Sequence, residues 1–329
     1  MFSFFYLTSD ILPPVFFNFS TLVINNATFS YSFLAPKYWL TWLSVLILYL
    51  LSWLPYKVQI ILGKLLGRLV YRFVKKRRKI AQVNIGLAFP ELSPEEQKKL
   101  VIENLENTGI AIFESGMAWW WPEWRAKKHF GGVTGFEHID GAIKNGKGVL
   151  MLVPHMMHLE VAGRMVGMFN NGIGFYRPHN NPLMEYIIVK GRLRFSEALV
   201  TKRDVKGLLK ALGQQKLCYY LPDQDYGRKR SEFVPFFAVE ETCTTTGTLI
   251  FASSKKSETL ALSTYRKGDK YYLEVGPILE DFPSGNDVED VTRVNQEMEH
   301  AIRKAPEQYL WLHRRFKTQK DPEARSYYK

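Results

Sequence analysis

The chain has 329 residues, of which 46% are hydrophobic and 14% aromatic, and its formal net charge is +12. This apolar content excludes a disordered chain and is enough for one large α/β core or two modest ones. The two cysteines, Cys218 and Cys243, are far apart and do not have a metal-ligand spacing. The sequence therefore offers no disulfide framework and suggests no zinc or iron–sulfur site, which fits a reducing compartment.

The first element that the sequence predicts is a membrane-spanning helix over residues 38–56. No charged residue lies between Lys37 and Lys57, and tryptophans stand near both ends of the run, as in an interfacial aromatic belt. A buried core helix is the alternative; a cleaved signal peptide fits less well, because a small-residue cleavage site is lacking. Residues 1–37 form a short N-terminal segment to which the sequence assigns no structure.

A basic amphipathic helix is predicted next, over residues 57–80. Its cations include Lys64, Arg68 and Arg72, and leucine, valine and phenylalanine residues alternate with them. Such a run fits a nucleic-acid patch, but directly after a membrane span it is more typical of a helix on an anionic bilayer surface. The positive-inside rule then places residues 81–329 in the cytoplasm, and no Gly/Ser-rich linker divides them into two domains.

The cytoplasmic part has the alternating pattern of an α/β protein. The segment Ser93-Pro94-Glu95-Glu96 is a capping box with proline at the first helical position, and it opens a helix predicted to run to about Met117. Apolar runs typical of strands follow, at first alternating with helical patterns. These runs cover residues 148–153, 172–176, 217–221, 259–264 and 271–275.

The central motif places a histidine and a glutamate five residues apart, His155 and Glu160, where a predicted strand runs into a helix. In one continuous helix these side chains would point about 140° apart, so they can meet only if His155 lies in the turn and Glu160 in the first helical turn. Pro154 ends the strand and permits this geometry. His155 would then lie at the carboxyl end of a strand, where open α/β sheets bind ligands.

Other polar residues of interest are Arg177, Arg192, Asp223 and Asp225. The two aspartates follow an apolar strand and could form a carboxylate dyad or a magnesium site. Without a Gly-rich phosphate loop, we interpret them as orienting arginines or substrate hydroxyls, with a structural turn as the alternative. His158 completes a His-x-x-His-x-Glu pattern, but the spacing differs from the zinc protease motif, so we predict no metal site.

Five segments together make a family signature, and through them the chain resembles the late acyltransferases of lipid A biosynthesis, the lauroyl/palmitoleoyl group of Gram-negative bacteria. The resemblance runs from about Phe33 to about Lys317. The segments are the His155-to-Glu160 motif, Tyr176-Arg177-Pro178-His179-Asn180-Asn181-Pro182, Gly191-Arg192-Leu193-Arg194, Pro222-Asp223-Gln224-Asp225-Tyr226-Gly227 and residues 305–317.

The resemblance implies transfer of a fatty acyl chain, lauroyl in our prediction, from acyl carrier protein to a 3-hydroxyacyl hydroxyl of Kdo2-lipid IVA. It implies a glycerol-phosphate-acyltransferase-like α/β sandwich, no cofactor, and a place on the cytoplasmic face of the inner membrane. His155 and Glu160 match the family's His-x4-acid motif, while Arg192 and Asp223 match further activity-critical positions. Arg177 is a weaker candidate.

The residue chemistry agrees with this activity. A secondary hydroxyl needs a base such as His155 to take its proton, and Glu160 would hold the imidazole tautomer. Guanidinium groups such as those of Arg192, Arg194 and Arg315 suit the phosphates of the acceptor. The alternatives are a palmitoleoyl- or myristoyl-transferring paralogue, another lipid acyltransferase, a membrane-tethered nucleic-acid-binding protein and a membrane scaffold; the last two would not need His155.

Overall fold

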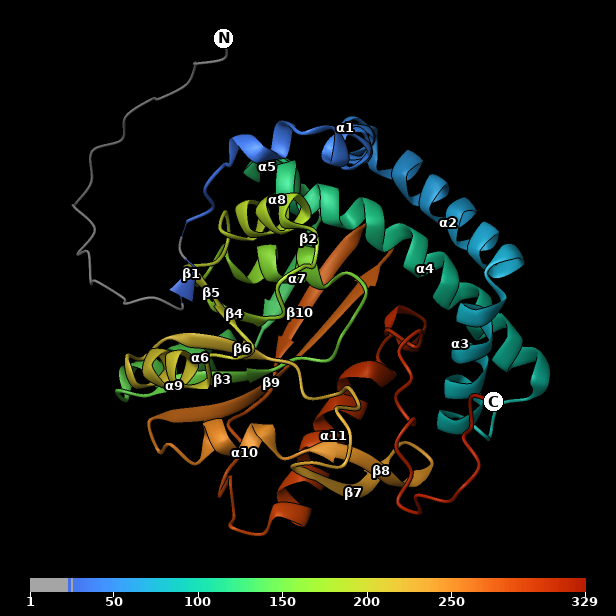
Figure 1. Ribbon diagram of the computed structural model, residues 1–329. Coiled ribbons are helices and arrows are strands. Elements are labelled where there is room, and N and C mark those ends of the chain that lie inside the picture. Colours follow the sequence, from blue (N-terminus) through green and yellow to red (C-terminus); the bar gives the residue numbers. More distant parts are fainter. Residues whose placement is uncertain (1–22, 25) are drawn as a thin grey trace.

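The computed structural model describes residues 23, 24 and 26–329, which fold around a mixed β-sheet flanked by helices (Figure 1). Within the described residues the sheet has eight strands, in the order β1-β5-β4-β6-β3-β9-β10-β2. Its strands are β1 (Val23–Ile24), β2 (Phe130–Thr134), β3 (Gly148–Leu152), β4 (Ile173–Tyr176), β5 (Ala198–Thr201), β6 (Leu217–Tyr220), β9 (Ser257–Lys267) and β10 (Lys270–Val275). The predicted α/β class is confirmed, whereas the glycerol-phosphate-acyltransferase type stays a prediction.

The centre of the sheet is parallel. Strand β3 pairs in parallel with β6 and β9, and β4 pairs in parallel with β5 and β6. Antiparallel pairs join β9 to β10 and β1 to β5, and a two-stranded hairpin of β7 (Ser231–Phe236) and β8 (Val239–Thr245) lies apart from the sheet. All five predicted strands are found, as β3, β4, β6, β9 and β10, and β9 extends beyond its predicted ends.

Helices cover both faces of the sheet. They are α1 (Trp39–Ser52), α2 (Tyr56–Phe73), α3 (Lys75–Ala88), α4 (Pro94–Trp120), α5 (Glu123–Lys128), α6 (Phe136–Lys144), α7 (Leu159–Val166), α8 (Pro182–Arg192), α9 (Val205–Gly213), α10 (Gly247–Ala252) and α11 (Asp287–Arg303), with short 3₁₀ helices at Tyr31–Leu34, Pro36–Tyr38 and Pro306–Gln308. The predicted capping box is confirmed, because the Ser93 and Glu96 side chains each accept a hydrogen bond from the other residue's backbone N–H.

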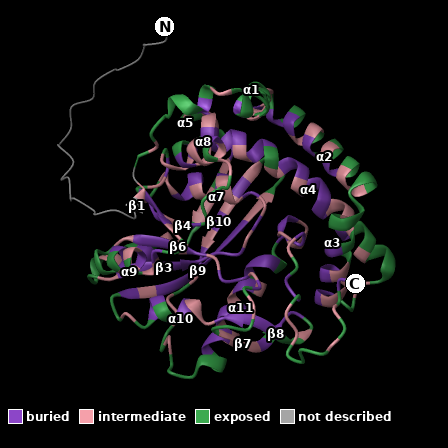
Figure 2. Cartoon of the chain, in the orientation of Figure 1, coloured by how far each residue is buried: buried purple, intermediate pink, exposed green. Residues whose placement is uncertain are grey.

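Strand β3 divides the hydrophobic core into two layers, because its alternate side chains point to opposite faces. Val149 and Met151 pack with apolar residues of α4, α6 and α7. Leu150 and Leu152 pack with residues of α9, α10 and α11. All of β3 is buried, as Figure 2 shows for the centre of the sheet. A strand covered on both faces reads as a continuous apolar run, which is why the sequence predicted it.

The basic stretch predicted as one helix over residues 57–80 forms two helices, α2 and α3, which are separated at Val74. Helix α2 packs closely along α4 at positions without side chains. A Cβ atom at Gly67 would collide with the carbonyl of Leu105, and one at Gly109 would collide with the carbonyl of Gly63. Helix α2 lies on the outside of the molecule (Figure 1), and its basic residues are exposed, as the amphipathic pattern of the sequence predicts.

The predicted membrane-spanning helix over residues 38–56 is not found. Helix α1 has 14 residues and ends at Ser52, because Pro55 cannot continue the backbone hydrogen bonding and the chain turns into α2. The amide of Gln59 stabilises this turn by donating to the carbonyls of Ser52 and Leu54, at 2.8 and 2.7 Å. None of the described helices is both long and apolar enough to cross a membrane.

Candidate active site

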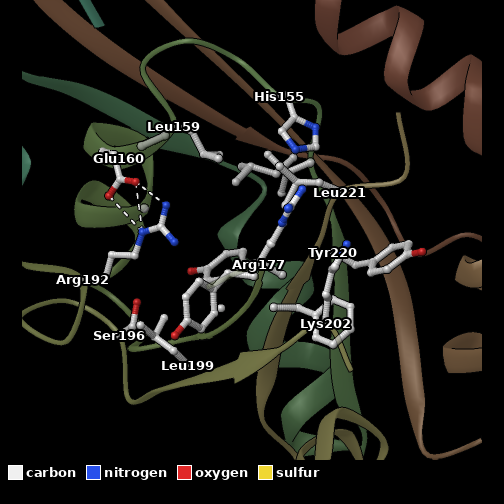
Figure 3. Close-up of a pocket in the computed structure, with 18 of the residues that line it drawn as sticks. His155, Leu159, Glu160, Arg177, Arg192, Ser196, Leu199, Lys202, Tyr220 and Leu221 are labelled. Atoms are coloured by element: carbon white, nitrogen blue, oxygen red, sulfur yellow. Dashed lines mark hydrogen bonds and ion pairs between the residues drawn. The ribbon is translucent and has the colours of Figure 1, made fainter. Parts of the chain in front are cut away.

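The candidate site lies where the carboxyl ends of β3, β4 and β6 meet, at the mouth of a cavity of about 630 Å³ (Figure 3). Strand β3 ends at Leu152, Pro154 follows, and His155 lies in the turn that leads to α7. Glu160 lies in the first turn of α7. The predicted strand–turn–helix arrangement is confirmed, and both side chains line the cavity.

His155 is held by Asp223 rather than by Glu160. Leu152 of β3 lies opposite Tyr220 of the parallel strand β6. His155 and Asp223 each lie three residues after this pair, at the same edge of the sheet. One carboxylate oxygen of Asp223 is 2.6 Å from the His155 Nδ1, and the other accepts the His155 backbone N–H at 2.9 Å. The Asp223 side chain is fully buried. Its burial opposes ionisation, but the electrostatic attraction of the neighbouring His155 ring and these hydrogen bonds hold the pKa of the Asp223 carboxyl below its usual value.

Glu160 instead binds Arg192, so the prediction that it orients the imidazole is wrong. The Glu160 Oε1 accepts from the Arg192 Nη2 at 2.5 Å and from its Nε at 3.0 Å. The indole N–H of Trp119 donates to the other oxygen at 2.9 Å. Helix α7 directs the carboxylate toward the end of α8 and away from the turn, and Figure 3 draws Glu160 and Arg192 on one side of the pocket and His155 on the other.

The ion pair matters for the charge of Arg192. Burial alone lowers the pKa of a guanidinium, but the Glu160 carboxylate, together with nearby Tyr176 and Glu185, more than offsets this and raises the pKa of Arg192 above its usual value. The guanidinium also lies over the ring of Tyr176, 5.7 Å from its centroid. Arg192 is therefore a fixed cation beside the cavity, and its Nη1 has no hydrogen-bond partner among the described residues.

Behind this polar mouth the cavity is mainly apolar. It passes between α7 and the strands β4 and β6, and small residues of α7 and β4, Gly163 and Gly174, keep it open. The apolar lining residues are Val153, Leu159, Ala162, Val166, Phe175, Phe195, Leu199, Leu221 and Leu262. The site therefore joins a histidine–carboxylate pair to a space suited to a hydrocarbon chain.

Comparison with known proteins agrees with this combination of features. Residues 26–318 match the model of the bacterial lipid A biosynthesis acyltransferase family. The chain belongs to this family. It is 41% identical over 292 residues to a lipid A biosynthesis palmitoleoyltransferase of Escherichia coli K12, covering 88% of this chain and 95% of the relative. It is 42% identical over 296 residues to a lauroyltransferase of the same organism, covering 89% and 96%. Identity to the E. coli myristoyltransferase is 30% over 317 residues, covering 91% and 93%.

The remaining predicted site residues of this acyltransferase have different positions. Arg177 is exposed at the cavity mouth, and its side chain has no partner among the described residues. Asp225 is buried away from the cavity and accepts hydrogen bonds from the backbone N–H and hydroxyl of Thr318, at 2.7 and 2.9 Å. Asp225 thus fixes the C-terminal segment, as in the structural alternative, and it does not line the cavity.

His158 also has a structural position. Its Nε2 lies 3.0 Å from the Thr264 hydroxyl of β9, behind the active-site turn. Burial, with the nearby charge of Arg266, lowers the pKa of His158 to about 3, so the ring is neutral. Within the described part of the chain, no cluster of His, Cys, Asp and Glu is arranged to hold a metal ion.

Sequence reasoning missed several residues around the site. Lys202 and Arg203 line the cavity together with the expected Arg192, whereas Arg194 and Arg315, which were also expected in the basic lining, do not. Arg194 instead donates to the Trp119 carbonyl, and Arg315 is buried and donates to the Cys243 carbonyl at 2.7 Å. Lys202 and Arg203 could have been found from the apolar strand β5 directly before them, because parallel strands bring the residues that follow them to one edge of the sheet.

Proposed function

We propose that this acyltransferase moves a lauroyl chain from acyl carrier protein to a 3-hydroxyacyl hydroxyl of Kdo2-lipid IVA, with His155 as the general base. The observation that carries the proposal is the His155–Asp223 pair at the mouth of an apolar cavity. The near-equal identities to a lauroyltransferase and a palmitoleoyltransferase make palmitoleoyl the alternative chain.

In the proposed reaction the acceptor hydroxyl attacks the thioester carbonyl as its proton passes to the Nε2 of His155. Asp223 keeps the proton of the neutral ring on Nδ1, which leaves Nε2 free to accept, and it stabilises the imidazolium that forms. The tetrahedral intermediate then releases the carrier protein thiolate, which takes the proton back from Nε2. The products are an ester and a free thiol, and the reaction needs no cofactor and no acyl-enzyme.

Arg192 is the proposed donor to the oxyanion of the tetrahedral intermediate. It lines the same cavity as His155, and the ion pair with Glu160 fixes its orientation. A positioned cation in a largely water-excluded site stabilises developing negative charge far better than a mobile one in water. Glu160 is then a positioning residue, which acts through Arg192 and explains why a His-x4-acid spacing suits this site.

The membrane is the proposed location, because many of the exposed residues of α1 and α2 are apolar. Figure 2 colours the outward positions of both helices as exposed. Exposed cations flank the apolar residues on α2, namely Lys57, Lys64, Arg68 and Arg72. The exposed apolar residues are Trp39, Leu40, Leu43, Leu46, Ile47, Leu50, Val58, Ile61, Leu65, Leu69 and Phe73. Such a surface suits the cytoplasmic face of the inner membrane, where basic residues meet anionic headgroups.

An acyl-transfer assay tests the proposed function. Membrane fractions with wild type, His155→Ala or His300→Ala are incubated with radiolabelled Kdo2-lipid IVA and a panel of acyl carrier protein thioesters. His300 is exposed on α11 and serves as the matched control. We expect acyl addition by wild type and His300→Ala, with lauroyl preferred, and none by His155→Ala. Full activity of His155→Ala would refute the base, and preference for palmitoleoyl would replace the chain assignment.

A further inference from the structure

The cavity mouth carries more positive charge than the proposed reaction uses. Among the residues that the structure describes, four cationic side chains line the cavity, from Arg177, Arg192, Lys202 and Arg203, but only one carboxylate, that of Glu160. Glu160 pairs with Arg192. The other three cations are exposed and have no acidic partner among the described residues. Three like charges beside one opening form a surface that attracts an anion.

The fold brings these cations together. Strands β4 and β5 are parallel with Tyr176 opposite Thr201, so Arg177 and Lys202 are the next residues at the same edge. The Lys202 backbone N–H continues the pairing by donating to the Tyr176 carbonyl at 2.7 Å. Asp204 is the nearest acid along the chain, but it is buried and its carboxylate caps α9. The cluster therefore keeps its charge.

The chemistry of the site indicates its ligand. A guanidinium binds two oxygens of a phosphate side by side, and a lysine adds a point charge, so the three cations suit a phosphate monoester. The apolar cavity directly behind them is suited to a hydrocarbon chain. A ligand that fits both parts is an amphiphile with a phosphorylated headgroup, and Figure 3 draws Arg177 and Lys202 in the same pocket as His155.

We propose that Arg177, Lys202 and Arg203 bind a phosphate of the acceptor's sugar headgroup and so position the reacting hydroxyl at His155. This inference rests on the proposed function. A carrier protein also has a phosphate, but that group is at the far end of a long pantetheine arm from the thioester. The three cations line the same cavity as His155, so an anionic group bound by them belongs to the substrate that presents its hydroxyl to the base.

Binding measured without turnover tests the proposal. In the His155→Ala background, the affinity for Kdo2-lipid IVA in detergent micelles is compared with that for the same lipid after phosphatase treatment. We expect the pair Arg177→Gln and Lys202→Gln to weaken binding of the phosphorylated lipid by about tenfold or more and to leave binding of the dephosphorylated lipid unchanged. Lys206→Gln is the matched control, because Lys206 is exposed nearby but does not line the cavity. Lys202→Arg should retain binding.

Two results would overturn the proposal. One is an equal loss of affinity for both lipids, which would mean that the cations do not act on phosphate. The other is an unchanged lipid affinity with a raised KM for the acyl carrier protein thioester in the His155-containing variants, which would assign the cluster to the donor. Failure of the proposed function is a separate result, because it appears as absence of acyl transfer by wild type with every thioester.

Discussion

Replacing Asp223 by asparagine is the sharpest test of the active-site geometry. The carboxylate is fully buried and accepts two hydrogen bonds from one residue, from the His155 Nδ1 at 2.6 Å and from the His155 backbone N–H at 2.9 Å. Asparagine has nearly the same shape but only one acceptor oxygen. One of the two donors must then lose its partner, and the ring is no longer held with its proton on Nδ1.

The expected magnitude follows from this loss. Removing the carboxylate partner of a catalytic histidine lowers kcat by about 10³ to 10⁴, which corresponds to about 4–5.5 kcal/mol of transition-state stabilisation. The unpaired buried donor destabilises the fold by about 1–3 kcal/mol. Because Asp223 does not line the cavity, KM for both substrates should change little.

Single-turnover acyl transfer by purified enzyme measures the effect, and a double-mutant cycle shows whether Asp223 acts through His155. Asp223→Asn should add almost nothing to the defect of His155→Ala, because the group that it orients is gone. A kcat of Asp223→Asn within about tenfold of wild type would refute the reasoning. So would a full additional loss in the His155→Ala background. Circular dichroism and thermal unfolding check that the variant is folded.

Three further predictions concern stability, measured by thermal unfolding of the full chain in detergent. The pKa of His158 is lowered to about 3, so below pH 6.5 the unfolded chain binds a proton that the folded chain does not. The free energy of unfolding of wild type should therefore fall by about 1.4 kcal/mol per pH unit as the pH falls from 6.5. His158→Gln should flatten this dependence, and His300→Gln should not. Asp225→Ala should destabilise by about 2–4 kcal/mol, because it leaves Thr318 donors unpaired; an unchanged Tm would contradict this. Tyr219→Phe should be neutral or stabilising, because the buried Tyr219 hydroxyl has no partner among the described residues; a lowered Tm would reveal one.

The local features of the active site could be predicted from the sequence because they depend on neighbours along the chain. The apolar run of β3, the break at Pro154 and the helix that follows fix the place of His155 at a strand end. The capping box likewise fixed the start of α4. Each of these is set by hydrophobic periodicity or by a hydrogen bond over a few residues, so no tertiary information is needed.

The single helix predicted over residues 38–56 shows where composition is insufficient to place a helix end. The charge-free run is long enough to span a bilayer, but the structure ends α1 at Ser52 and turns the chain at Pro55. At this turn the carbonyl of Ser52 accepts hydrogen bonds from the Gln59 amide and from the Trp121 indole N–H, the latter at 2.5 Å. Trp121 is 69 residues away in the sequence. A hydropathy pattern cannot register such a distant partner.

The sequence by itself determined the chemical class of this protein: an α/β acyltransferase with a histidine base at the end of a buried strand. Only the tertiary structure decided which carboxylate serves that base. Asp223 is 68 residues from His155, and the parallel pairing of β3 with β6 brings them within 2.6 Å. Glu160 is five residues away, but α7 turns it toward Arg192. The local sequence fixes the secondary-structure element in which a residue lies, whereas strand register and helix packing decide which side chains come into contact.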